Sequence, residues 1–153
     1  MFKNYNKIYF IGIGGIGMSS IALYFINYGK QVAGYDKTKN ALTKKLSELG
    51  AQIHYESKTS DIPREFLNNL ETLIIYTPAI SKDNMELSYF FNNNFTVLKR
   101  SEVLGEIAKD KFCIAIAGTH GKTTTTSMIG SILKDSDLDP TIIVGGVVKS
   151  INT

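Results

Sequence analysis

A strand-like apolar run that ends in a glycine-rich turn constrains this chain more than any other feature. Residues 8–11 read Ile-Tyr-Phe-Ile, and Gly12, Gly14 and Gly17 follow in the spacing G-x-G-x-x-G. Apolar residues then recur at the spacing of one helix face, at Met18, Ile21, Ala22 and Phe25. A strand, a glycine turn and a helix in this order predict a parallel α/β unit. They also favour a diphosphate site at the start of the helix, because the free N–H groups and the helix dipole attract anions.

Short apolar runs keep alternating with helical patterns as far as residue 109. Strands are predicted at 31–35, 53–55, 72–76 and 96–98, and apolar faces predict helices around 42–49, 87–91 and 103–108. Asp83 and Glu86 have the spacing of a capping box at the start of the helix at 87–91. The alternation predicts an α/β fold: a Rossmann-like parallel sheet with helices on both faces.

A second strand, turn and helix begin after residue 110. The apolar run 112–117 leads into the turn 118–123, which reads Gly-Thr-His-Gly-Lys-Thr, and a helix with Ile129, Ile132 and Leu133 on one side follows. A last strand is predicted at 141–144. These elements cannot form a complete NTPase core, so we expect two domains. Residues 1–109 would be the Rossmann-like domain, and residues 110–153 the truncated start of a P-loop ATPase domain.

The second turn has residues that suit the phosphates of ATP. Backbone N–H groups near Gly121 can bind phosphate oxygens, Lys122 supplies a positive charge, and the hydroxyl of Thr123 is placed to bind Mg²⁺. We expect Lys122 and Thr123 to be catalytic and His120 to be a polar loop residue. The full Walker pattern is not met, because its first glycine would fall at Ile116. The predicted ATP-binding residues are Gly118, Thr119, His120, Gly121, Lys122, Thr123 and Thr124.

The first turn leaves the identity of its ligand open. Asp36 follows the second strand about 20 residues after the glycines, where an acidic side chain can reach a ribose hydroxyl, and a solvated turn residue is an equal alternative. The motif does not distinguish NAD, FAD and a UDP-sugar, and a turn without a ligand also fits. The alternatives are therefore an NAD-binding oxidoreductase, which leaves the turn at 118–123 unexplained, and a non-catalytic nucleotide-binding module.

Composition excludes several other classes of protein. The net charge is only +3 and the lysines are spread along the chain, so nothing favours a nucleic-acid partner. The single cysteine, Cys113, excludes an internal disulfide and is expected to be a small buried residue. No apolar stretch approaches the roughly 18 residues of a membrane span, and residues 1–6 do not resemble a signal peptide. We expect a cytoplasmic protein without a membrane partner.

Several segments, in the same order along the chain, resemble the Mur ligase family of cell-wall synthesis. Residues 11–19 (Ile-Gly-Ile-Gly-Gly-Ile-Gly-Met-Ser) resemble the start of these enzymes, and residues 117–126 (Ala-Gly-Thr-His-Gly-Lys-Thr-Thr-Thr-Thr) resemble their ATP loop. Residues 76–80, 99–102 and 145–149 match further family segments. The resemblance covers nearly the whole chain. The string at 14–19 favours the branch that joins L-alanine to UDP-N-acetylmuramate over the branch that recycles a tripeptide.

The resemblance implies an ATP-dependent, amide-forming ligase of peptidoglycan precursor synthesis. ATP would phosphorylate the carboxylate of UDP-N-acetylmuramate, the amine of L-alanine would attack the acyl phosphate, and Mg²⁺ would neutralise the charge on the transferred group. His54 stands where some relatives carry a Gly-His pair near the uracil, so no uracil contact is assigned to it. The implied UDP-sugar contacts are Gly14, Gly15, Ile16, Gly17, Asp36, Thr77 and Ala79.

The resemblance also implies that the chain is an amino-terminal piece. The adenine pocket, the remaining metal ligands and the L-alanine site would lie outside it, so this piece is expected to be inactive alone. The strands predicted at 112–117 and 141–144 are apolar enough to be central in a complete sheet. Without that sheet we expect the segment from Phe112 onward to be poorly ordered, to pack against the first domain, or to associate with a second copy. The chain is thus a candidate homo-oligomer.

Overall fold

Five parallel strands form one sheet in the order β3-β2-β1-β4-β5. The computed structural model describes residues 2–81, 83–109, 111–136 and 138–145. The strands are β1 (Lys7–Ile11), β2 (Gln31–Tyr35), β3 (Gln52–His54), β4 (Thr72–Tyr76) and β5 (Thr96–Lys99). The helices are α1 (Ile16–Asn27), α2 (Ala41–Glu48), α3 (Met85–Asn92), α4 (Arg100–Ala108) and α5 (Lys122–Lys134), with short 3-10 turns η1 (Phe2–Asn4), η2 (Thr59–Asp61) and η3 (Arg64–Phe66).

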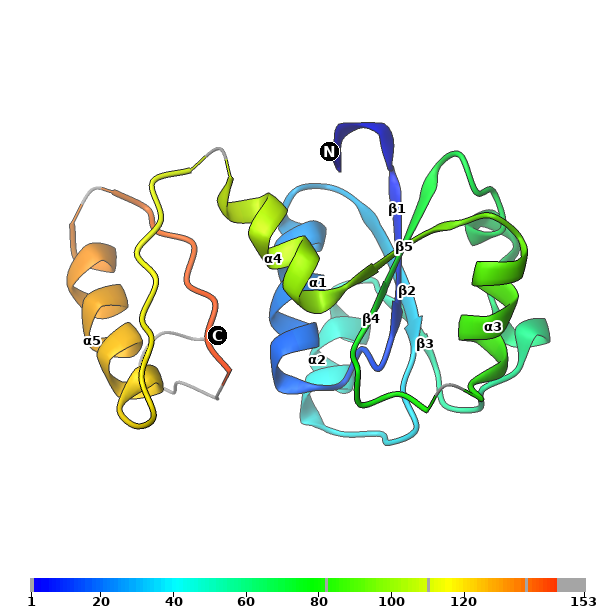
Figure 1. Cartoon of the computed structure of the whole chain (residues 1–153), viewed down its shortest axis with the longest axis horizontal. Coiled ribbons are helices and arrows are strands. Elements are labelled where there is room, and N and C mark those ends of the chain that lie inside the picture. The colour runs from blue at the N-terminus through cyan, green and yellow to red at the C-terminus, as the bar shows by residue number, and fades with distance from the viewer. Residues whose placement is uncertain (1, 82, 110, 137, 146–153) are drawn as a thin grey trace.

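Helices cover both faces of this sheet. Figure 1 shows α1, α2 and α4 on one face, and α3 on the other. The predicted Rossmann-like α/β fold is therefore confirmed. No helix in the described part of the chain is both long enough and apolar enough to cross a membrane.

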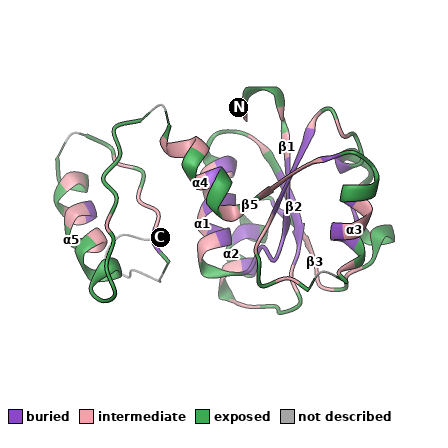
Figure 2. Cartoon of the chain, viewed as in Figure 1, coloured by how far each residue is buried: buried purple, intermediate pink, exposed green. Residues whose placement is uncertain are grey.

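The central strand β1 is buried on both faces. Ile8 and Phe10 pack into the apolar cluster under α1, α2 and α4, whereas Tyr9 and Ile11 pack into the cluster under α3. Alternate side chains of a strand point to opposite faces, so a strand between two layers of helices needs an unbroken apolar run. This requirement explains why the apolar run at 8–11 correctly predicted a strand. Figure 2 shows the buried residues concentrated along the strands.

The direction of the strand order reverses at β1. The chain moves from β1 to β2 and β3 on one side, and segment 55–71 then returns it to β4 on the other side of β1. In open α/β sheets a ligand crevice forms at such a reversal, outside the carboxyl ends of the strands. The turn after β1 and the turn after β4 therefore meet at one edge of the sheet.

The capping box predicted at Asp83 and Glu86 is wrong. The N-cap of α3 is Asn84, whose side chain accepts a hydrogen bond of 2.9 Å from the N–H of Leu87. Glu86 is fully buried and bonds to Tyr9 of β1 instead of the helix start. The contact to another element thus replaces the local cap that the spacing of the two residues suggested.

The strands predicted at 112–117 and 141–144 are also wrong. Neither segment joins a ladder among the described residues, and Phe112 is 96% exposed. Cys113, which was expected to be buried, is exposed as well. A strand needs a neighbouring backbone to pair with, and apolar composition alone does not supply one. The helix after the second turn is confirmed as α5, and its Gly130 packs against Ile142.

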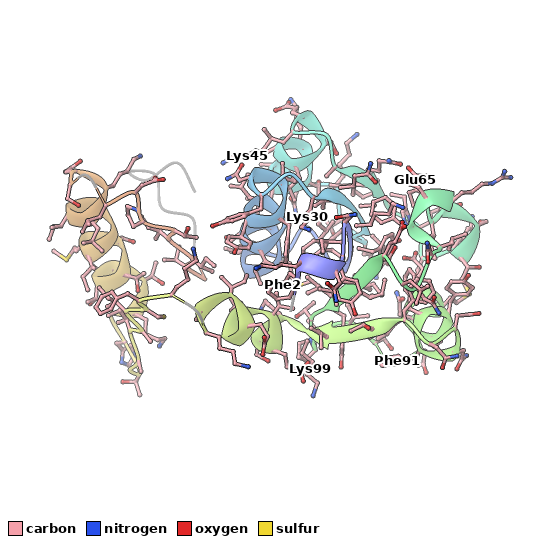
Figure 3. The ribbon with its side chains drawn as sticks, turned by 90° about the horizontal axis from the view of Figure 1, so that it is seen from above. Phe2, Lys30, Lys45, Glu65, Phe91 and Lys99 are labelled. Atoms are coloured by element: carbon pink, nitrogen blue, oxygen red, sulfur yellow. The ribbon has the colours of Figure 1, made fainter. Side chains whose placement is uncertain are left out.

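The part of the chain that contains α5 lies beyond α4, apart from the sheet. Figures 1 and 3 agree on this placement from two directions, and Figure 2 shows that most of this part is exposed. The division of the chain at residues 109 and 110 and the association with a second copy remain predictions.

Truncating one phenylalanine in each part of the chain should lower the free energy of unfolding by very different amounts. Phe10→Ala should lower the free energy of unfolding by about 3–5 kcal/mol, because it leaves a cavity in the buried core. Phe112→Ala should change it by less than about 0.5 kcal/mol, because that side chain lies in water. Urea unfolding followed by circular dichroism measures both. A large loss for Phe112→Ala would show that residues 112–117 pack in solution.

Candidate functional site

The first glycine turn folds back over the end of β2. Gly12 has a φ of +89°, and the N–H groups of Gly12 and Ile13 both donate to the carbonyl oxygen of Tyr35, at 2.7 and 3.1 Å. A Cβ atom at Gly12 would lie only 2.9 Å from Cγ2 of Thr77. The backbone conformation and the close approach of the turn after β4 thus both require glycine at this position.

Asp36 supports the glycine turn from the end of β2. One carboxylate oxygen accepts the N–H of Gly14 at 2.7 Å, and the other accepts the N–H of Thr38 at 2.9 Å. Asn40 donates its side-chain amide to the carbonyl oxygen of Gly14 at 3.2 Å. A Cβ at Gly14 would lie 2.7 Å from Cγ2 of Thr43, so the turn is closely enclosed here. Sequence analysis did not foresee this structural role of Asp36, and its contact with a ribose stays a prediction.

Two backbone donors at the start of α1 are left for a ligand. The N–H of Gly15 donates to Gly12 at 3.2 Å, and those of Met18 and Ser19 donate to Gly15 at 3.0 and 2.8 Å. The first N–H groups of a helix have no partner within the helix. In the described part of the chain, the N–H groups of Ile16 and Gly17 therefore remain available, whereas Gly14 and Gly15 use their N–H groups to shape the turn.

The start of α1 also lacks the usual neutralising groups. It has no side-chain cap and no acidic residue in its first turn. By contrast, the starts of α2 and α3 are capped by the side chains of Asn40 and Asn84. An uncapped helix start carries a partial positive charge that favours an anion.

Arg100 adds a full positive charge to the same place, and sequence analysis did not assign it to the site. It is the first residue of α4, which packs against α1, and Figure 3 labels its neighbour Lys99 at the junction of β5 and α4. A Cβ at Gly17 would touch the guanidinium, with Cζ at 3.2 Å. No ion pair or hydrogen bond to Arg100 is found among the described residues. The one sequence feature that could have pointed to Arg100 is the segment 99–102, which the sequence analysis used only as part of the family resemblance.

Thr77 and Ala79 occupy the turn that follows β4. Thr77 packs against Gly12, and its carbonyl oxygen accepts the N–H of Ile80 at 3.0 Å. Ala79 is exposed. The structure thus brings Thr77 next to the glycine turn, whereas it leaves Ala79 on the rim, away from the described contacts of that turn.

The second glycine turn is exposed and curls around the ammonium of Lys122. Gly121 is the N-cap of α5 with a φ of +77°, and Lys122 is the first residue of the helix. The Lys122 ammonium donates to the carbonyl oxygen of Gly118, and to that of Thr119 at 3.0 Å. Residues 118–124 are all exposed, and α5 has no side-chain cap. The turn therefore presents a lysine and an uncapped helix start to solvent, which is the arrangement that phosphate groups favour.

No cluster of three acidic, histidine or cysteine side chains able to hold a metal ion occurs among the described residues. The hydroxyl of Thr123, at the start of α5, is the oxygen ligand that the sequence suggested. Mg²⁺ commonly binds through one or two protein oxygens together with phosphates and water. Thr123 fits that pattern.

Comparisons with known proteins identify the family of this chain. Residues 7–112 match the sequence profile described as "Mur ligase family, catalytic domain". The UDP-N-acetylmuramate–L-alanine ligase of Flavobacterium psychrophilum is 52% identical over 97% of this chain and 33% of its own length. That of Flavobacterium johnsoniae is 51% identical over 96% and 32%. The chain thus spans about a third of the length of these relatives.

Solved structures show the same similarity. The UDP-N-acetylmuramate–alanine ligase of Thermotoga maritima superposes with a TM-score of 0.84 at 34% identity, over 94% of this chain and 33% of that one. The UDP-N-acetylmuramate:L-alanyl-γ-D-glutamyl-meso-diaminopimelate ligase of Neisseria meningitides gives 0.83 at 26% identity, over 95% and 44%. With the family profile matched over well more than half of its length, the chain belongs to the Mur ligase family.

Proposed function

We propose that the five-stranded unit binds the diphosphate of UDP-N-acetylmuramate at the start of α1. The observation that carries this proposal is the convergence of three donors that have no partner within the described ranges: the N–H groups of Ile16 and Gly17 and the guanidinium of Arg100. A diphosphate supplies two adjacent anionic groups, and a guanidinium can bind phosphate oxygens in a bidentate manner. The relatives named for UDP-N-acetylmuramate support the choice of nucleotide.

Each remaining residue of the first turn has its own part in this proposal. Gly14 and Gly15 shape the turn, and Gly17 leaves room for Arg100. Asp36 holds Gly14, and Thr77 packs against Gly12. Asp36, Thr77 and Ala79 lie around the edge of the sheet where the nucleoside or the sugar would extend. Their direct contact with the ligand is part of the proposal.

We further propose that a complete protein containing this chain ligates L-alanine to UDP-N-acetylmuramate at the expense of ATP. The turn 118–124 would bind the phosphates of ATP, with the Lys122 ammonium leaving its own carbonyl partners for phosphate oxygens. The hydroxyl of Thr123 would hold Mg²⁺, which neutralises negative charge on the transferred phosphoryl group. The chain alone is expected to be inactive, and the cytoplasmic location remains a prediction.

An NAD-binding oxidoreductase is the alternative that the first glycine turn alone would allow. Asp36 could contact a ribose in either case. The family membership and the second turn both favour the ligase, and only the ligase uses both turns. Parallel titrations with UDP-N-acetylmuramate and with NADH distinguish the two, since the proposal requires binding of the UDP-sugar and none of NADH.

Removing the charge of Arg100 should weaken UDP-sugar binding. Arg100→Ala should cost about 1.5–3 kcal/mol of binding free energy, the usual worth of a hydrogen bond to a charged group. The melting temperature should not fall, because Arg100 has no described polar partner to lose. Isothermal calorimetry measures the affinity, and the exposed neighbour variant Lys99→Ala should bind like the wild type. Equal affinity for Arg100→Ala and the wild type would remove Arg100 from the site.

Adding a side chain at Gly15 tests the turn itself. The residue is exposed with a φ of −65°, and a Cβ would meet no atom closer than 3.5 Å, so Gly15→Val should fold normally. A branched side chain beside the free N–H groups should nevertheless block the diphosphate and abolish binding in the same calorimetric assay. A folded Gly15→Val protein with unchanged affinity would place the UDP-sugar elsewhere.

The role of Lys122 is best measured in a longer protein that contains this chain. Lys122→Ala should lower ATP-dependent ligation by orders of magnitude, because the lysine charge stabilises the transferred phosphoryl group. Lys134→Ala, at the far end of the same helix, is the matched control and should retain activity. The isolated 153-residue chain should release no phosphate from ATP above the level of its own Lys122→Ala variant.

A further inference from the structure

A cluster of three polar side chains, two of them fully buried and His54 partly exposed, lies between the sheet and α3, and the proposed function does not use it. The hydroxyl of Tyr9 in β1 is 2.6 Å from Nε2 of His54 in β3 and 2.6 Å from Oε2 of Glu86 in α3. Tyr9 and Glu86 are fully buried, and Oε1 of Glu86 has no hydrogen-bond partner among the residues that the structure describes. Since a buried carboxylate normally has all its oxygens paired, this cluster requires an explanation.

The tautomer of His54 follows from its second contact. Nδ1 lies 2.9 Å from the carbonyl oxygen of Glu56. A carbonyl oxygen can only accept a hydrogen bond, so Nδ1 carries a proton. In a neutral imidazole Nε2 is then an acceptor.

Counting protons shows that the cluster needs one more. With Glu86 ionised and His54 neutral, the hydroxyl of Tyr9 faces two acceptors and has one proton, so one of the two short contacts cannot be a hydrogen bond. One additional proton satisfies both contacts. Placed on Glu86, it lets the carboxyl donate to Tyr9 and Tyr9 donate to His54; placed on Nε2 of His54, it reverses both bonds.

We propose that Tyr9, His54 and Glu86 form a buried site for one exchangeable proton, and that this proton positions the loop after β3 at the ligand edge of the sheet. The ligand of this site is therefore a proton, held between β1, β3 and α3, which are distant in sequence. The proton makes both hydrogen bonds of the cluster possible at the same time.

The surroundings of Glu86 favour the carboxyl group as the place of the proton. Burial, together with the charge of Asp61 in η2, raises the pKa of Glu86 to about 7 against the opposing effect of the Tyr9 hydrogen bond. Burial and the neighbouring Glu86 likewise raise the pKa of Tyr9, so the phenol keeps its own proton.

Among the described residues, the other charged or titratable groups around the cluster do not neutralise Glu86. The ring of Tyr35 in β2 lies beside that of His54, with centroids 5.8 Å apart and planes tilted by 41°. Burial and the nearness of Glu86 raise the pKa of the Tyr35 phenol. The Lys58 ammonium pairs with the Glu56 carboxylate rather than with Glu86.

The cluster is connected to the glycine turn through the backbone of His54. Its carbonyl oxygen accepts the N–H of Asp36 at 3.2 Å, and the Asp36 carboxylate holds Gly14. On the other side of the loop, Asn84 donates to the hydroxyl of Ser57 at 2.8 Å. The proton therefore fixes the end of β3. Asp36, which supports the glycine turn, is hydrogen-bonded to that end.

The sign of the pH dependence follows from the raised pKa. A carboxyl group whose pKa rises from 4.5 to about 7 on folding contributes stability that is fully present below its unfolded pKa. That contribution is lost as the pH rises through about 7. Stability should therefore decline with rising pH in this window.

Glu86→Gln imitates the protonated state permanently and is the decisive variant. Its amide can donate to Tyr9 at every pH, so the cluster keeps both hydrogen bonds without a titrating group. We expect the melting temperature of the wild type to fall relative to Glu86→Gln as the pH rises from 4.5 to about 7, and to level off above that. The exposed neighbour variant Asp83→Asn should follow the wild type. A melting profile of Glu86→Gln parallel to that of the wild type would overturn the proposal.

Infrared spectroscopy of the wild type gives an answer even if Glu86→Gln does not fold. A chain labelled with ¹³C-glutamate should show the carbonyl band of one protonated carboxyl group at about pH 6, below the raised pKa of Glu86, and the band should disappear as the pH rises through about 7. Spectra with carboxylate bands alone at about pH 6 would contradict the proposal.

One further measurement concerns the positioning role and rests on the proposed function. UDP-N-acetylmuramate affinity should decrease with rising pH in the wild type and remain constant in Glu86→Gln. If neither protein binds the UDP-sugar, the proposed function fails while the melting and infrared results still decide the proton site. If both bind it with the same pH dependence, the positioning role is wrong.

Discussion

The parallel pairing of β1 with β2 and β4 is the constraint on which the rest of the structure depends. Phe10 lies opposite Gly34 in β2 and Ile75 in β4, and the backbone of Phe10 leaves no room for a side chain at Gly34. Because parallel strands run in the same direction, their carboxyl ends meet at a single edge. The glycine turn, Asp36 and Thr77 come together there because each follows one of these three strands.

Electrostatics distinguishes two pairs of helices, α2 and α3 on the one hand and α1 and α5 on the other. The starts of α2 and α3 are closed by asparagine side chains, so their partial positive charge is already satisfied within the protein. Those of α1 and α5 follow glycine turns, have no side-chain cap, and have Arg100 or Lys122 beside them. The partial positive charge of an uncapped helix start and the full positive charge of the nearby arginine or lysine repel each other unless an anion lies between them. An anion bound there would stabilise the protein, by an amount that grows with the logarithm of its concentration.

The sequence predicted the features whose signals are local. The apolar runs at 8–11 and 72–76 became β1 and β4, and the glycine turn lies between a strand and a helix as expected. Arg100 was missed because its position over Gly17 depends on how α4 packs against α1, and no local pattern records that packing.

Errors arose where tertiary contacts override local rules. Glu86 has the spacing of a capping residue, yet burial against Tyr9 decides its role. The run at 112–117 has the composition of a buried strand, but strand formation depends on a partner backbone that the described residues do not provide. Sequence analysis likewise could not foresee the bond between Asp36 and Gly14, since it joins two turns that only the sheet brings together.

The position of Arg100 gives helix α4 two neighbours at once. Its first residue lies over α1, and its nine residues form a rod about 13 Å long that leads toward the segment with the second glycine turn. A substitution that broke α4 would therefore change both the place of Arg100 beside Gly17 and the path of the chain toward that turn.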